Sequence, residues 1–460
     1  MRAHRGHLIH IGGAPSLAEV RAHLVSEPDG VLVVDDAGAI VFAGAHGGMP
    51  AELAHAEVID HRPGFLLPGF VDTHIHFPQT YCTVAYGGGQ LLDWLQRCVF
   101  PAESRLEELE FAHRVARDFC RRRISTGTTT ALVFGSAFPH AQDALFAESL
   151  RIGLRTISGR GIQTTGPASA ARLITGEDEA IALTEAEIAR WHAADTGDPA
   201  TALLHAAVVP RFSLSVTART LHGLGELYDE VRSRGVYFHS HLSENTAEVA
   251  AVRQAYGVES YLDTYDGRFG PGSAVAGKTL LGRRSVLAHA VHCRDDELAR
   301  MAETATSIAH CPTSQLFLGS GTMPWRRTTA SGVVVAMGSD VGGGDEWLIP
   351  RVLNDSFKVH MSEPDDDAVA LHPAELLFAG TLAGARALDL EERVGNFDAG
   401  KEADFVVLDP QRQLLLPELL AQADPADTDR LLFTLLMGLR EAAVARVFVR
   451  GREMVSGPIG

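Results

Sequence analysis

The chain has 460 residues, of which 46% are hydrophobic and 21% charged, a balance typical of a folded protein with a full apolar core. Disordered and collagen-like chains are therefore excluded. The 40 basic and 58 acidic residues give a net charge of -18, which disfavours nucleic acid as a partner, and no apolar run approaches the roughly 20 residues that span a bilayer. The first residues also contain no apolar signal region, so we expect a cytoplasmic protein with no membrane partner.

The chain begins with short strand patterns. Residues 31–34, 40–43 and 58–60 are apolar and are separated by turn-forming Asp-Asp-Ala-Gly and Gly-rich stretches. These patterns predict a small β-rich unit at the N-terminal end, before a longer region of a different kind.

The longer region alternates apolar strand patterns with helical patterns. Residues 103–123, for example, have apolar residues at a spacing near 3.6 and predict a helix that ends before Gly127. Eight strands with helical connections predict an α/β fold, a (β/α)8 TIM barrel over residues 68–394, with its active site at the carboxyl ends of the strands. The predicted strands are residues 70–76, 128–134, 154–160, 203–211, 236–242, 285–290, 306–311 and 333–339.

Strand patterns return at the C-terminal end. Residues 403–408 and 444–449 read as strands, residues 421–429 as a loop and residues 430–443 as a helix. We infer that the two ends, residues 1–67 and 395–460, fold together as a small β-sandwich beside the barrel.

Two His-x-His motifs stand on predicted strands. His74 and His76 project from one face of the first barrel strand, and His239 and His241 do the same on the fifth. A chain with 21 histidines contains about one such motif by chance, so either motif alone is weak evidence for a metal site.

The position of the polar residues is stronger evidence. His241 ends the fifth strand, His289 the sixth and His310 the seventh, while Asp340 follows the eighth. Three imidazoles and one carboxylate match the ligand preference of zinc, with ferrous iron as an alternative. The candidate ligands are His74, His76, His241 and Asp340.

Longer motifs make the chain resemble the amidohydrolase superfamily and, within it, the guanine deaminases. The resemblance extends from about residue 68 to residue 408. It implies zinc on the four candidate ligands. The motifs that carry it are Pro68–Gln79, Pro210–Phe212, His241–Asn245, Ala288–His289, His310–Ser314 and Gly338–Val341.

The lysine content bears on the number of metal ions. Members of this superfamily with two metals usually bridge them with a carboxylated lysine at the end of the fourth strand, but the first lysine of this chain is Lys278. That bridge cannot form. We therefore expect one metal ion per chain, which suits the deamination of a ring.

The resemblance also implies roles for the remaining site residues. Asp340 would accept a proton from the attacking water, Glu244 would carry a proton to the ring and to the leaving ammonia, and His289 would orient the water. Gln79, Arg211 and Phe212 would bind the substrate, since a guanidinium, a carboxamide and a phenyl ring suit the edge and the face of a purine.

We therefore predict a zinc-dependent hydrolase that deaminates a small heterocycle, with guanine converted to xanthine and ammonia. One alternative keeps the chemistry and changes the substrate to another aminopurine, a pterin or an aminotriazine. A second alternative, from a different class, is a noncatalytic scaffold barrel. Related enzymes are often dimers, which predicts a homodimer here, and His292 and His310 receive no role as ligands.

Overall fold

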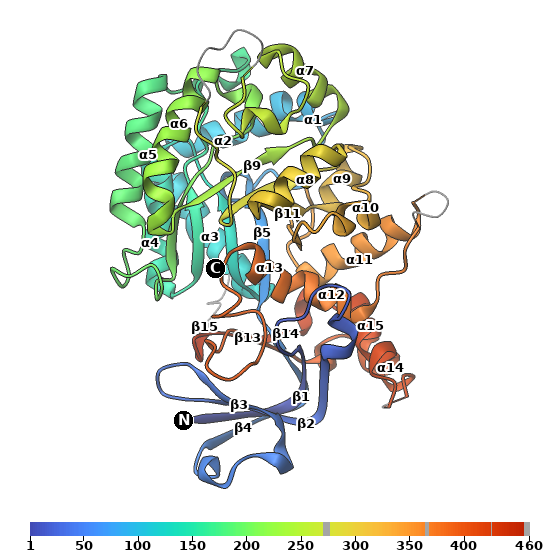
Figure 1. The fold of residues 1–460 in the computed structure, drawn as a ribbon. Coiled ribbons are helices and arrows are strands. Elements are labelled where there is room, and N and C mark those ends of the chain that lie inside the picture. Colours follow the sequence, from blue (N-terminus) through green and yellow to red (C-terminus); the bar gives the residue numbers. More distant parts are fainter. Residues whose placement is uncertain (270–276, 364–367, 425, 455–460) are drawn as a thin grey trace.

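The computed structural model describes residues 1–269, 277–363, 368–424 and 426–454. Its strands form two sheets, one of eight strands and one of seven. Figure 1 shows the larger sheet inside a ring of helices and the smaller one at the opposite end of the molecule from α1 and α7. Within the described residues, no helix combines the length and the apolar character needed to cross a membrane.

The eight-stranded sheet is the predicted barrel. Neighbouring strands pair in parallel, in the order β12-β11-β10-β9-β8-β7-β6-β5. Each strand lies within its predicted range, which confirms the (β/α)8 prediction. The strands are β5 (Phe70–His76), β6 (Thr128–Phe134), β7 (Arg155–Gly159), β8 (Leu204–Val208), β9 (Tyr237–Leu242), β10 (Ser285–His289), β11 (Ser307–His310) and β12 (Val335–Met337).

Hydrogen bonds beyond the end of β12 close the barrel. The amide of Asp340 donates to the carbonyl of His74, and the amide of His76 donates to the carbonyl of Val341, both at 2.8 Å. The closing contact thus joins the two segments that carry candidate ligands, β5 and the residues after β12.

Most helices pack around the outside of the barrel (Figure 1). The start of α7 is capped by Asn245, whose side chain accepts from the amide of Ala247 while Glu248 accepts from the amide of Asn245. The helices are α1 (Leu91–Trp94), α2 (Phe100–Ser104), α3 (Leu109–Ser125), α4 (Pro139–Ile152), α5 (Glu177–Trp191), α6 (Ala218–Val231), α7 (Thr246–Tyr256), α8 (Asp295–Thr304), α9 (Pro312–Leu318), α10 (Trp325–Ala330), α11 (Ile349–Met361), α12 (Pro373–Gly380), α13 (Leu382–Ala387), α14 (Leu416–Ala421) and α15 (Thr428–Gly438).

Two helix predictions need correction. The helix expected over residues 103–123 is divided into α2 and α3, because the backbone is extended at Glu108 (φ −78°, ψ 116°). The helix expected over residues 430–443 begins earlier, at Thr428, because Asp427 caps it by accepting from the amide of Arg430, and it ends at Gly438. Residue 425 of the expected loop lies outside the described residues.

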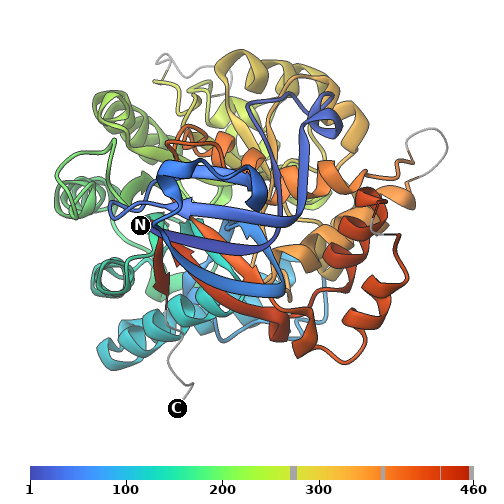
Figure 2. The same ribbon diagram turned by 90° about the horizontal axis from the view of Figure 1, so that it is seen from below.

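The smaller sheet is built from both ends of the chain, as predicted. Its order is β15-β14-β13-β4-β1-β2-β3, so hydrogen bonds join N-terminal and C-terminal strands in one mixed sheet (Figure 2). The strands β1 and β15 were not expected from the sequence, since charged residues and histidines interrupt the apolar pattern. The strands are β1 (Arg2–Ile11), β2 (Leu24–Val34), β3 (Ile40–Ala45), β4 (Glu57–Pro68), β13 (Phe405–Leu408), β14 (Val444–Val449) and β15 (Arg452–Met454).

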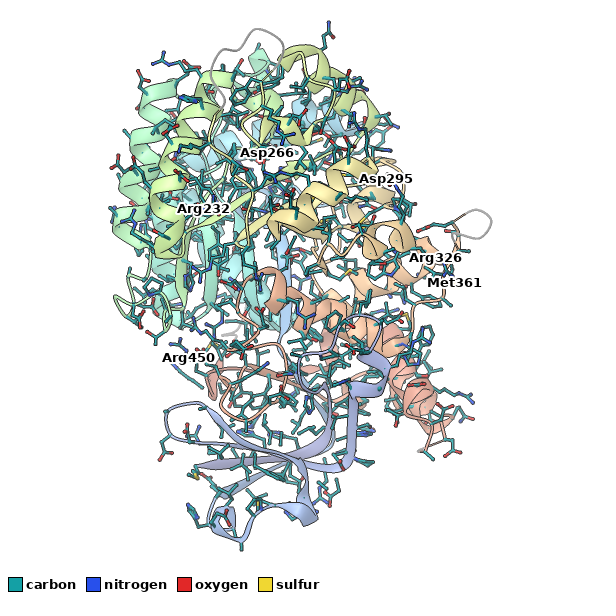
Figure 3. All side chains as sticks on the ribbon, viewed as in Figure 1. Arg232, Asp266, Asp295, Arg326, Met361 and Arg450 are labelled. Carbon is teal, nitrogen blue, oxygen red and sulfur yellow. The ribbon has the colours of Figure 1, made fainter. Side chains whose placement is uncertain are left out.

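Buried charges connect the barrel to this terminal sheet. Arg155 of β7 is fully buried and forms ion pairs with Glu402 and with Asp404, the latter at 3.2 Å. Arg450, labelled at the junction in Figure 3, donates from Nε to Glu402 at 2.7 Å. The terminal sheet is therefore fastened at the amino ends of the barrel strands, and the carboxyl ends are left for a site.

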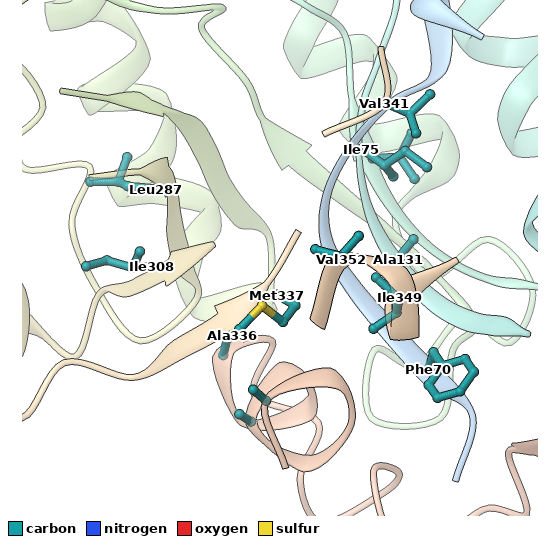
Figure 4. Close-up of a cluster of buried hydrophobic side chains, with 14 of the residues drawn as sticks. Phe70, Ile75, Ala131, Leu287, Ile308, Ala336, Met337, Val341, Ile349 and Val352 are labelled. Carbon is teal, nitrogen blue, oxygen red and sulfur yellow. The ribbon is translucent and has the colours of Figure 1, made fainter. Parts of the chain in front are cut away.

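Apolar side chains fill the space between the barrel and its helices. Figure 4 shows Phe70 and Ile75 of β5 and Ala131 of β6 in one cluster with Ile349 and Val352 of α11. This packing holds β5 in place, and β5 carries two of the candidate ligands.

Candidate active site

The four candidate metal ligands meet at the carboxyl end of the barrel. The Nε2 atom of His76 lies 3.2 Å from Nε2 of both His74 and His241. Oδ1 of Asp340 lies 3.0 Å from Nε2 of His74 and 3.1 Å from Nε2 of His76. Zinc bonds of about 2.0–2.1 Å in a tetrahedron place ligand atoms roughly 3.3 Å apart, so the spacing fits one such ion.

Hydrogen bonds behind the imidazoles fix their protonation. Nδ1 of His239 lies 2.8 Å from the carbonyl oxygen of Val286, which can only accept, so His239 keeps its proton there and offers a lone pair at Nε2. That lone pair accepts from Nδ1 of His74 at 2.7 Å. Nδ1 of His241 donates in the same way to the carbonyl oxygen of Arg211 at 2.5 Å.

The consequence is that His74 and His241 both direct an Nε2 lone pair at the same point. Burial lowers the pKa of His74 and of His239 to about 3, and it holds the pKa of His241 well below its ordinary value, so the rings are neutral. Converging lone pairs repel one another unless a cation lies between them. The donor set therefore fits a divalent metal ion.

The backbone around Asp340 is held by a second buried carboxylate. Asp72 of β5 accepts from the amide of Ser339 at 3.0 Å, from the hydroxyl of Ser339 at 2.6 Å and from the amide of His74 at 3.2 Å. Asp72 thus fixes Asp340 relative to β5.

Three residues beside the site have a backbone conformation that side chains other than glycine rarely adopt. φ is +48° at Ser243, +75° at His289 and +50° at Asp340. Backbone strain of this kind persists only where the surrounding contacts hold it in place. Here it occurs where the chain turns at the ends of β9, β10 and β12, at the mouth of the barrel.

His289 and Glu244 face the same centre from β10 and from the end of β9. Nε2 of His289 lies 3.3 Å from Oε2 of Glu244 and 3.9 Å from Oδ2 of Asp340. Neither ring nitrogen of His289 has a hydrogen-bond partner, although the residue is fully buried. Ligand atoms of His74, His241, His289 and Asp340 all lie within 4.8 Å of one another, so His289 is close enough to contact a water at the centre.

The two carboxyl groups of the site have opposite tendencies. Burial, and then the charges of Asp340 and Glu248, raise the pKa of Glu244 well above its ordinary value. Burial also acts to raise the pKa of Asp340, but the neighbouring His74 and His76 outweigh it and hold that pKa well below its ordinary value. Glu244 can thus give a proton while Asp340 stays ionised.

A pocket opens above this centre. The predicted substrate-binding residues Gln79, Arg211 and Phe212 all line it, together with His76 and Glu244. Its apolar walls come from the segment that contains α1, with Leu91, Trp94 and Leu95, and from Leu318 at the end of α9. An aromatic ring bearing polar groups suits such a pocket.

Sequence reasoning missed two residues that hold this site together. His239 was seen only as half of a common motif, although its alternation with His241 along one strand face already placed it inside the barrel. Glu103 was included in a helix, yet it forms a buried ion pair with Arg211 and accepts from Gln79. The signal was Arg211 itself, since a charge predicted inside the barrel requires a partner.

The histidines left without a role lie to one side of the centre. Nε2 of His292 donates to the carbonyl oxygen of Ser320 at 2.8 Å, and the hydroxyl of Ser320 lies 3.5 Å from Glu244. His310 packs against His360, with their Nε2 atoms 3.1 Å apart. Among the described residues, neither histidine belongs to the group whose ligand atoms cluster at the centre.

Comparisons with known proteins agree with this geometry. The amidohydrolase family matches residues 65–454. A probable guanine deaminase of Deinococcus radiodurans is 39% identical over 459 residues, which cover 98% of each chain. The guanine deaminase of Escherichia coli is 34% identical over 94% of this chain and 93% of its own. The solved structure of guanine deaminase from Bradyrhizobium japonicum superimposes with a TM-score of 0.88 at 29% identity and covers 99% of both chains.

Proposed function

This chain belongs to the amidohydrolase family, and we propose that it hydrolyses the exocyclic C–N bond of guanine, giving xanthine and ammonia. The observation that carries the proposal is one pocket with two parts. Its floor contains His76, His241 and Asp340, which together with His74 have the spacing of ligands around one metal ion, and its walls contain Gln79, Arg211 and Phe212.

The proposed ligands are the four residues predicted from the sequence, with one zinc ion per chain and iron as the alternative. His76 lies 3.1–3.2 Å from the other three ligands, and His74 lies 3.0 Å from Asp340, whereas His289 approaches Asp340 only to 3.9 Å. When bound at such a centre, zinc lowers the pKa of water to about 7 and supplies hydroxide at neutral pH.

The side chains around the centre divide the proton transfers. Asp340, held ionised, accepts the proton that the attacking water loses, and His289 orients that water from the side of β10. Glu244, whose raised pKa keeps it protonated, gives its proton to the ring nitrogen. It then passes the proton that Asp340 took from water to the departing amino group, and it recovers a proton from the hydroxyl group on the attacked carbon. The C–N bond then breaks, and the ring retains the oxygen.

The pocket walls bind the ring in this proposal. Phe212 presents an aromatic face, and Arg211 and Gln79 present donors and an acceptor to the polar edge of the purine. A neutral ring with an amino group over the metal centre satisfies all three contacts at once.

The test is a direct assay. Purified protein loaded with zinc is incubated with guanine, and xanthine and ammonia are measured together; equal amounts of the two products are expected. A panel of adenine, pterin and aminotriazine substrates serves as the comparison. Turnover of one of these rings without turnover of guanine would assign the same chemistry to a different substrate, and no turnover on any ring would favour a scaffold.

We also propose a homodimer in the cytoplasm. Leu414, Leu415 and Leu419 are 91%, 66% and 49% exposed, an apolar surface that association could bury. All five cysteines are unpaired, which suits a reducing compartment. Sedimentation analysis and cell fractionation test the two statements separately.

A further inference from the structure

One carboxylate contacts both polar residues that are proposed to bind the ring. Oε2 of Glu103 accepts from Nη1 of Arg211 at 2.5 Å, and Oε1 of Glu103 accepts from Nε2 of Gln79 at 3.0 Å. Each oxygen thus serves a different side chain. Glu103 does not line the pocket itself, so it acts on a ligand only through Arg211 and Gln79.

We propose that Glu103 is a positioning residue that determines the charge selectivity of the pocket. By neutralising Arg211 and fixing the amide of Gln79, it makes the pocket prefer an uncharged purine ring to an anionic one. This inference rests on the proposed function and names the property of the ring that the site selects.

Burial makes the charge of Glu103 effective. Glu103, Arg211 and Gln79 are 4%, 3% and 2% exposed, so water screens the pair little. A guanidinium is always charged in proteins, and without Glu103 it would attract any anion that enters the pocket. The Cζ atom of Arg211 lies 5.3 Å from the centre of the Phe100 ring. This ring covers the guanidinium and excludes water on that side.

The neighbouring titratable groups do not replace this charge. Cys82 lies near the pair, but burial, followed by the charge of Glu103, raises its pKa to about 12, so the thiol stays neutral. The remaining acidic groups of the pocket, Glu244, Glu248 and Asp340, surround the metal centre and the start of α7. Arg211 is the sole cation among the described side chains that line the pocket, apart from any charge on the histidines.

Glu103 also fixes which way the amide of Gln79 faces. With its nitrogen bound to Glu103, the amide oxygen of Gln79 accepts from the amide of Gly342 at 3.2 Å. One N–H and one lone pair of Gln79 remain for a ligand. A rotated amide would present the same two groups in exchanged positions, so Glu103 specifies the pattern that the ring must match.

The proposed substrate and product differ in charge at mildly alkaline pH. Xanthine is a stronger acid than guanine and loses a proton in mildly alkaline solution, whereas guanine does not. An uncompensated Arg211 would hold ionised xanthine after each turnover. The paired Arg211 favours the neutral substrate and releases the anionic product.

The experiment compares xanthine binding to Glu103→Gln and to the wild type, both loaded with zinc, by calorimetry at a mildly acidic and a mildly alkaline pH. The ratio of wild-type Kd to variant Kd should rise at least about tenfold between the acidic and the alkaline pH, because only the anion benefits from the freed charge. For guanine, the variant should raise KM by roughly tenfold and change kcat much less.

Two further variants separate charge from structure. Glu103→Asp keeps the charge, so its Kd ratio should not change with pH even if KM rises. Glu107→Gln removes a charge four residues along the chain, where Glu107 pairs with Arg172 at the surface. It should change neither the pH dependence of the Kd ratio for xanthine nor the KM for guanine.

The outcomes decide the proposal in each case. A Kd ratio for Glu103→Gln that is the same at both pH values overturns it, and so does a wild type that binds no xanthine. Should Glu103→Gln fail to fold, Arg211→Met exposes the charge of Glu103 and must give the opposite sign, with xanthine binding lost more steeply at alkaline pH. A wild type that binds xanthine with the expected pattern but leaves guanine intact refutes the proposed function and supports the role of Glu103.

Discussion

Replacing His239 by alanine tests the reasoning about the metal centre most directly. His239 is fully buried, and Nε2 of His239 accepts a hydrogen bond from Nδ1 of His74 at 2.7 Å. His239→Ala leaves that donor buried without a partner, at a cost of about 1–3 kcal/mol. The ring of His74 is then free to rotate or to change tautomer, so Nε2 no longer offers a fixed lone pair to the metal.

The expected loss of zinc affinity is about 10–100-fold, the range for residues that orient a metal ligand, which corresponds to about 1.4–2.7 kcal/mol. This loss of binding free energy is of the same size as the cost of leaving the His74 donor without a partner, which is expected if the lost hydrogen bond causes both. The assay is competition for zinc between the protein and a chromogenic chelator of known affinity. His239→Gln should recover much of the affinity, because a carboxamide oxygen can accept from Nδ1 of His74.

A matched control is available in the same barrel. His205 of β8 is 3% exposed, and Nε2 of His205 donates to the carbonyl oxygen of Ala202 at 3.3 Å, away from the metal centre. His205→Ala should destabilise the fold and leave zinc affinity unchanged. Wild-type affinity in His239→Ala, or an equal loss in His205→Ala, would refute the argument.

Three other outcomes are expected. Glu244→Gln should retain zinc, measured by elemental analysis, and lose at least about 100-fold in kcat, because an amide cannot transfer the proton; a near-normal rate would contradict this role. Gly338→Ala should lower the free energy of unfolding in urea by about 1–3 kcal/mol, because the added carbon would lie 2.8 Å from Cβ of His74; unchanged stability would mean that β5 yields easily. Burial raises the pKa of Glu187 from 4.5 to about 8, so the folded state keeps a proton that the unfolded state loses, and stability falls as pH rises through that range. Glu187→Gln should therefore gain stability relative to the wild type between those two pH values in thermal melts, and a constant difference would contradict the raised pKa.

Much of the fold could be predicted because its signals are local. Alternation and short apolar runs located all eight barrel strands, and alternation also placed His74 and His76 on one face of β5. The terminal strands β1 and β15 were missed because their burial comes from pairing with strands distant in sequence. In β1, for example, His4 is fully buried against Phe405 and Phe448.

The amino-acid sequence by itself determined the barrel, the candidate ligands and the absence of a bridging lysine, because each depends on spacing within one segment or on composition. Only the tertiary structure decided the partners of those side chains. His74 meets His239 across 165 positions, and Arg211 meets Glu103 across 108. Such pairs form only when the sheet closes and the segment after β5 folds over its mouth, since no local pattern encodes which buried donor will face which acceptor.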